Sequence, residues 1–216
     1  MKASDNMQKG RVLRLKSFGI LEFLQKNYIL IIILLSLILG ILVGSFKFDS
    51  NETLKNYFTD QIENFLQLRI NTTFNKVLFN SFFKSLAVLF LIFLLGASLF
   101  GVVTVPSAMF IKGFVVGGMS AFLYSQYGLK GVAFNSVIFI PTTLAFLVVL
   151  LLAGRESVKF SFKFSSLTHS KTLPQNLSND FKDYSIKYLI FMVLTFAASV
   201  VDAVVTKGFI KNFSLI

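Results

Sequence analysis

Few side chains could do chemistry inside the long apolar stretches that dominate this sequence. Lys112 is the only charge in the run 105–124, and Asp202 lies near the end of the run 188–205. A charge at the centre of a bilayer costs about 2.5–3.5 kcal/mol on insertion scales, so each needs a role or a partner. Lys112 has two interpretations: it snorkels to the headgroups, or it lines a functional path. A Lys112–Asp202 pair is not expected, because the topology inferred below places them near opposite membrane faces.

The groups required for familiar enzymatic chemistry are missing from the sequence. The chain has no cysteine, which excludes disulfides, thiolate nucleophiles and cysteine-ligated metals, and a single histidine, His169. It contains no Gly-x-Ser-x-Gly motif and no phosphate-binding glycine-rich loop. We therefore expect no catalytic residues, no cofactor, no metal site and no enzymatic activity.

Composition excludes both a soluble domain and a disordered chain. Of 216 residues, 55% are hydrophobic and 14% charged, whereas soluble domains are about 45–50% apolar and about 25% charged. A chain with 27 phenylalanines does not form a solvated coil. The net charge of +11 flanks the apolar runs, so its expected partner is membrane lipid and not nucleic acid.

Five apolar runs are long enough to span a bilayer, which takes about 20 residues. They cover residues 28–46, 85–103, 105–124, 132–153 and 188–205. These runs predict an all-α, polytopic helical membrane protein with about five transmembrane helices. The expected organisation is a basic tail (1–27), an anchor helix (28–46), an amphipathic loop (47–84), a four-helix membrane bundle (85–206) with a polar loop (154–187), and a short tail (207–216).

The distribution of Lys and Arg predicts the orientation. With five spans, twelve basic residues share the side of the N-terminus and of the loop 154–187, against eight on the other side. Cytoplasmic loops carry the excess of basic residues, so we expect a multi-pass protein of the bacterial cell membrane with a cytoplasmic N-terminus. The loop 47–84 and the C-terminus would then be external.

The external loop has the pattern of an amphipathic helix. Leu54, Phe58, Ile62 and Phe65 recur on one face, with polar residues between them. Such a helix either lies on the leaflet or bundle, or docks an external partner with its apolar face. The polar loop 154–187 is expected to lack a clear helix, and its alternating segment 158–164 indicates a short strand or an interfacial stretch.

Small residues and prolines mark the spans. Gly113 and Gly117, like Gly40 and Gly44, have the four-residue spacing that lets two helices approach closely, either within one bundle or between membrane proteins. Pro106 is expected to start the third helix or to form the hairpin before it. Pro141 is expected to kink the fourth, with nearby Ser, Thr and Asn side chains bonding freed backbone groups.

Four features follow one another in the segment 101–161: Pro106 followed by Lys112, Gly113 and Gly117; the turn Gly128–Gly131; Pro141 in mid-span; and the charged exit at Arg155. In this order they resemble the stage II sporulation protein M family of bacterial membrane proteins. Family members often have His-Gly or Gln-Asn after the mid-span proline, whereas this chain has Thr142 and Thr143. No functional residue is carried over at those positions.

The resemblance implies a role in forespore engulfment, as a non-enzymatic scaffold that localises extracytoplasmic peptidoglycan-degrading partners. Its partner-facing surface would be the external loop together with exposed small-residue helix faces, and it could also form a homo-oligomer. Two alternatives remain open: a membrane subunit of a transporter that works with a separate ATPase, and an intramembrane enzyme acting on lipid. The scarcity of intramembrane polar groups favours the scaffold.

Overall fold

The structure, a computed structural model, describes residues 27–49, 52–70, 72–169 and 177–210. Within these ranges the chain is helical apart from short turns, so the expected all-α fold is confirmed. The elements are α2 (Tyr28–Lys47), α3 (Glu52–Ile70), α4 (Phe74–Gly96), α5 (Gly101–Phe134), the π-helix η1 (Asn135–Phe139), α6 (Ile140–His169) and α7 (Leu177–Phe209). The basic tail (1–26) and residues 211–216 lie outside the described residues.

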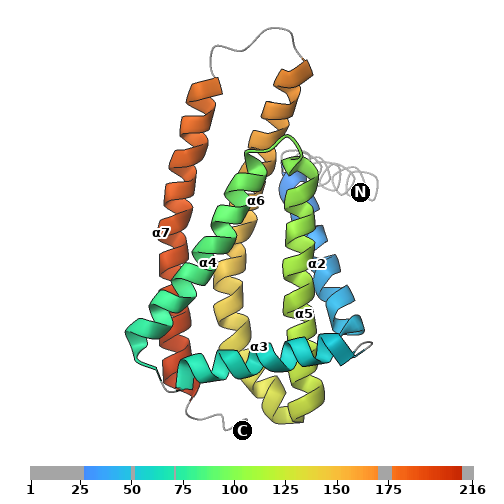
Figure 1. Cartoon of the computed structure of the whole chain (residues 1–216), viewed down its shortest axis with the longest axis vertical. Helices are drawn as coiled ribbons and strands as arrows, with labels where there is room; N and C mark the ends of the chain where they lie inside the picture. Colours follow the sequence, from blue (N-terminus) through green and yellow to red (C-terminus); the bar gives the residue numbers. More distant parts are fainter. Residues whose placement is uncertain (1–26, 50–51, 71, 170–176, 211–216) are drawn as a thin grey trace, which may run out of the picture.

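Four helical stretches in the described part of the chain are long and apolar enough to cross a membrane: α2, α4, the continuous stretch Gly101–Ser166, and α7. The third reverses direction at Gly128, whose φ of 53° and ψ of −132° favour glycine. The chain therefore runs along α5 and returns along α6 (Figure 1). Counted this way, five apolar segments run lengthwise, in line with the expected number.

The hairpin between α4 and α5 lies earlier in the sequence than expected. We expected the second span to reach Val103 and the turn to lie near Pro106, but α4 ends at Gly96 and α5 begins at Gly101. The Leu95 carbonyl oxygen approaches to 2.5 Å from the place where a Gly101 Cβ would stand. This close approach requires glycine at the start of α5, so the turn lies just before Gly101, and Pro106 lies inside α5.

Most of the expected polar loop 154–187 is helical, which corrects the prediction of a loop with a short strand. Helix α6 continues to His169 and α7 begins at Leu177, so the two form a hairpin that projects beyond the other helices (Figure 1). The alternation at 158–164 masked a helical period: Ser157 and Ser161, four residues apart, are both fully buried on one face.

The two ends of the molecule differ. Helix α3 lies across one end, together with the Gly128 turn and the C-terminal end of α7 (Figure 1). The start of α2 and the α6–α7 hairpin lie at the other end. This arrangement puts the predicted external pieces together at one end. That the α2 end faces the cytoplasm stays a prediction.

Candidate functional site

The small residues singled out in the sequence form a seam between α2 and α5, which is the most extensive contact of α2. A Cβ on Gly113 would collide with the Leu37 carbonyl, and one on Gly117 with the Ile41 carbonyl. Gly40 and Gly44 face α5 in the same way. The seam is thus internal to the chain, and these helix faces are not exposed for a partner, contrary to what we expected of the small-residue surfaces.

Pro106 belongs to the same seam. Its carbonyl oxygen accepts a hydrogen bond of 2.7 Å from Ser36 Oγ of α2. At the other end of the seam, Ser45 Oγ donates to the Gly117 carbonyl at 3.3 Å. Close backbone approach and interhelical hydrogen bonds from Ser hydroxyls are the ordinary means of joining helices in lipid. Pro106, Gly113 and Gly117 therefore have a packing role.

The apolar face of α3 packs on the bundle, as one of the two interpretations of its pattern expected, and the alternative that this face docks an external partner is wrong. Phe58 is fully buried and Ile62 is 3% exposed, while Leu54 and Phe65 are partly buried beside them. The Phe58 ring occupies the space left by the missing side chain of Gly118 on α5. Because the bundle buries this apolar face, the opposite, polar face of α3 is the exposed one.

An ion pair attaches the C-terminal end of α3 to α7. Arg69 Nη2 lies 2.6 Å from Asp202 Oδ2 of α7, and the same carboxylate oxygen accepts a hydrogen bond from Ser81 of α4. Arg69 also stacks on Phe65, with its Cζ 3.6 Å from the ring centroid. Burial lowers the pKa of the Arg69 guanidinium from its ordinary value, and the Asp202 charge opposes that shift. Asp202 thus holds α3, α4 and α7 together.

Lys207 of α7 completes this attachment. Its ammonium donates to the carbonyl oxygens of Arg69, at 2.9 Å, and of Thr72. These carbonyls lie at and just beyond the C-terminal end of α3, where the helix leaves acceptors unpaired and where a positive charge is favourable. Together, Lys207 and Asp202 fix the C-terminal end of α3 to α7.

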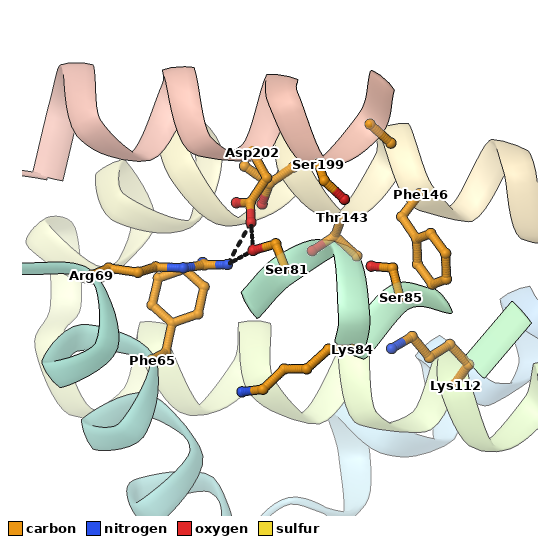
Figure 2. Close-up of a pocket in the computed structure, with 12 residues that line it drawn as sticks. Phe65, Arg69, Ser81, Lys84, Ser85, Lys112, Thr143, Phe146, Ser199 and Asp202 are labelled. Atoms are coloured by element: carbon orange, nitrogen blue, oxygen red, sulfur yellow. Dashed lines mark hydrogen bonds and ion pairs between the residues drawn. The ribbon is translucent and has the colours of Figure 1, made fainter. Parts of the chain in front are cut away.

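Beside this ion pair lies a polar cavity of about 180 Å³ to which five helices contribute (Figure 2). Its lining side chains are Phe65 and Arg69 from α3, Ser81, Lys84 and Ser85 from α4, Lys112 from α5, Thr142, Thr143 and Phe146 from α6, and Ala198, Ser199 and Asp202 from α7. The space is large enough for several waters or one small polar group. Three of the lining residues are cations and one is an anion.

Lys112 does not snorkel to the end of the bundle. Because α5 begins at Gly101, Lys112 lies about 16 Å along the helix axis, farther in than the sequence suggested. Its side chain lines the cavity, with Nζ 5.7 Å from the centroid of the Phe146 ring (Figure 2). Lys112 and Asp202, which we expected at opposite faces, thus line one cavity, although no ion pair joins them.

The remaining predicted residues shape the turn that brings α6 to the cavity. Gly128 supplies the positive φ, and a Cβ on Gly131 would collide with the Leu123 carbonyl. Pro141 follows the π-helical turn η1, and Thr142 Oγ1 donates to the carbonyls of Ile138 and Phe139 at 2.9 and 3.0 Å. π-Helical turns often occur at functional sites. Here the turn precedes Thr142 and Thr143, which line the cavity.

Two further polar clusters were not foreseen. In the α6–α7 hairpin, Ser157 bonds the hydroxyls of Tyr184 and Tyr188, and Glu156 pairs with Lys187 at 2.5 Å and with Lys159 at 3.1 Å. Asn135 is fully buried and donates to the Tyr124 hydroxyl at 2.6 Å. All these residues lay in segments interpreted as plain loop or span. The four-residue spacing of Ser157 and Ser161 was the one signal available.

These features define the class of protein: a polytopic helical membrane protein whose helices enclose a charged lateral cavity and carry an amphipathic helix across one end. The family model for stage II sporulation protein M matches residues 29–207. The chain therefore belongs to the stage II sporulation protein M family. No curated protein and no solved structure matches the chain.

Proposed function

We propose that the protein is a non-enzymatic membrane scaffold that retains peptidoglycan-degrading enzymes at the membrane during sporulation, with the outer face of α3 as their docking surface. Family membership supports a sporulation membrane protein. The observation that carries the docking surface is the placement of α3 across one end of the bundle with its polar face outward (Figure 1).

The outer face of α3 is acidic although the whole chain is basic. Glu52, Asp60 and Glu63 are exposed along it. The two basic residues of α3 do not neutralise these acidic side chains, because both are paired elsewhere. Lys55 pairs with Asp49 at 3.3 Å, and Arg69 points inward to Asp202. An acidic surface favours a partner with a basic patch, because complementary charge guides encounter and fixes orientation. The proposed partner is a peptidoglycan-degrading enzyme that presents such a patch.

The attachment of α3 suits a docking role. Phe58, Ile62 and Leu66 are buried against the bundle, and Arg69 and Lys207 fix the C-terminal end. A rigid binding surface loses little conformational entropy when a partner docks. A force applied to α3 by a bound enzyme would pass directly to α5 and α7.

The test is affinity purification of the full chain in mild detergent from sporulating cells of the native host, with mass spectrometry of the eluate. The double variant Asp60→Lys, Glu63→Lys should lose peptidoglycan-degrading enzymes that the unchanged chain retains, at least tenfold, because it reverses the charge of the docking face. The matched control is Asp183→Lys, an exposed charge reversal on the α6–α7 hairpin. It should retain them.

Two outcomes would contradict the proposal, the first its docking surface and the second the scaffold role itself. Hydrolases retained equally by the α3 double variant would exclude the outer face of α3. A cytoplasmic ATPase in place of hydrolases would favour the transporter alternative, which one observation supports: Lys112, Thr142 and Thr143 line the same cavity next to Pro141.

A further inference from the structure

The cavity beside α3 has more positive charge than its own residues neutralise. Asp202 is its only carboxylate, and that group is already engaged: Oδ2 binds Arg69 and Ser81, and Oδ1 accepts from Thr206 at 3.2 Å. Within the described part of the chain, Lys84 and Lys112 make no hydrogen bond or ion pair. The Lys112 ammonium lies 5.7 Å from the centroid of the Phe146 ring. Two lysines of the lining thus lack a counter-ion.

Their position makes that imbalance costly. Lys112 lies half-buried well inside α5, a segment apolar enough to span a membrane, whereas Lys84, near the middle of α4, is exposed. A cation removed from bulk water needs an anion and hydrogen-bond acceptors. The hydroxyls that share the cavity, Ser85, Thr143 and Ser199, are neutral. Among the described residues, no other carboxylate lines the cavity, so we look for the missing negative charge in a bound anion.

We propose that this cavity binds the phosphate group of an anionic phospholipid, with Lys84 and Lys112 as the ammonium donors. Arg69 offers a third donor, because its buried Nη1 has no hydrogen-bond partner among the described residues while Nη2 holds Asp202. Phosphate oxygens accept several charge-assisted hydrogen bonds at once. Basic pockets between transmembrane helices are known to hold anionic lipid headgroups.

The apolar surroundings favour a lipid over a soluble phosphate. The neighbours of the two lysines point outward: Phe83, beside Lys84, is 61% exposed, and Ile111, beside Lys112, is 62% exposed. An acyl chain would lie against these side chains while its phosphate reaches the lysines. The cavity is open to the surface, and Lys84 of its lining is exposed, so the proposed lipid can reach the lysines without crossing the bundle.

The test is the thermal unfolding midpoint of the full chain, purified in a mild non-ionic detergent and depleted of lipid. A ligand that binds only the folded state raises this midpoint. Phosphatidylglycerol should raise it clearly more than phosphatidylcholine, whose choline neutralises the phosphate. Lys112→Met should abolish the difference between the two lipids. The matched control Lys130→Met, an exposed lysine in the turn after Gly128, should keep it.

Three results would overturn the proposal. Inorganic phosphate that raises the midpoint as much as phosphatidylglycerol would make the ligand a soluble anion. An unchanged phosphatidylglycerol effect in Lys112→Met would place the lipid elsewhere. If Lys112→Met does not fold, a second variant is used in its place. This variant is Lys84→Gln, which changes an exposed residue of the lining, and its lipid binding is measured by native mass spectrometry. Phosphatidylglycerol adducts equal to those of the unchanged chain would then exclude the cavity. None of these readouts depends on a protein partner.

Discussion

The seam between α2 and α5 joins two helices through their backbones, whereas the cavity beside α3 joins five helices through charged and hydroxyl side chains. In the seam, Gly113 and Gly117 leave no room even for a Cβ. In the cavity, about 180 Å³ remains open, and two lysines have no counter-ion among the residues that the structure describes. Both regions lie in apolar segments, and both contain residues that the sequence marks as unusual.

The contrast separates two meanings of an unusual residue in a membrane helix. A small residue lowers the cost of close packing, and the chain itself supplies the surface that it meets. A charge raises the cost of insertion, and it is compensated only where a counter-charge is present. Arg69 and Asp202 neutralise each other's charge, whereas Lys112 has no counter-ion among the described residues. The seam therefore needs no further group to pack against, whereas the proposed lipid phosphate would supply the negative charge that the cavity lacks.

The largest expected effect concerns the Arg69–Asp202 ion pair, in which the cavity's charges neutralise each other. Asp202→Asn leaves the buried Arg69 charge without its partner, and we expect a loss of about 3–5 kcal/mol in the free energy of unfolding. The measurement is SDS-induced unfolding in mixed micelles, followed by circular dichroism. The matched control is Asp180→Asn, whose ion pair with Lys163 is exposed and should be worth about 0–1 kcal/mol.

The double variant Arg69→Met, Asp202→Asn sharpens this prediction. It removes both charges, so it should recover most of the stability lost by Asp202→Asn alone. If Asp202→Asn cost no more than Asp180→Asn, the ion pair would not be what fixes α3, and the contrast between a compensated and an uncompensated charge would fail.

The second effect tests the seam. Gly117→Ala places a Cβ against the Ile41 carbonyl, and we expect it to destabilise the folded chain by about 1–3 kcal/mol through overpacking. The control is Gly208→Ala, where a Cβ meets nothing within 4 Å and the helix tolerates alanine well. Equal unfolding free energies for the two variants would mean that α2 and α5 do not approach as closely as described.

How much the sequence could predict depends on the range of the interaction. The apolar runs, the amphipathic character of α3 and the glycine turn at Gly128 are local patterns, and the structure contains each of them. The Arg69–Asp202 pair joins residues 133 positions apart. Nothing in the spacing of charges along the chain selects Arg69 among several basic residues of the external loop.

The other failures have equally physical causes. An amphipathic pattern fixes which side of α3 is apolar but not whether lipid, a partner or the bundle covers it. The wide space at Gly118, which receives the Phe58 ring, was not recognisable from α3 alone. In the hairpin, buried Ser and Tyr replace the leucines of an ordinary helical stripe, so the hydropathy pattern concealed the continuation of α6 and α7.

The smallest expected effect concerns Lys112, the half-buried lysine of the cavity. Here the sign of the change in the free energy of unfolding is more informative than its size. In lipid-free neutral detergent, Lys112→Met removes a charge that has no counter-ion, so the variant should be more stable by on the order of 1 kcal/mol. This gain is smaller than the insertion cost of a lysine at the bilayer centre, about 2.5–3.5 kcal/mol, because water can enter the cavity. A destabilised variant would instead mean that the Lys112 ammonium holds the bundle together. A stabilised variant would indicate that the chain keeps Lys112 at a cost to its own stability, as residues kept for function often are.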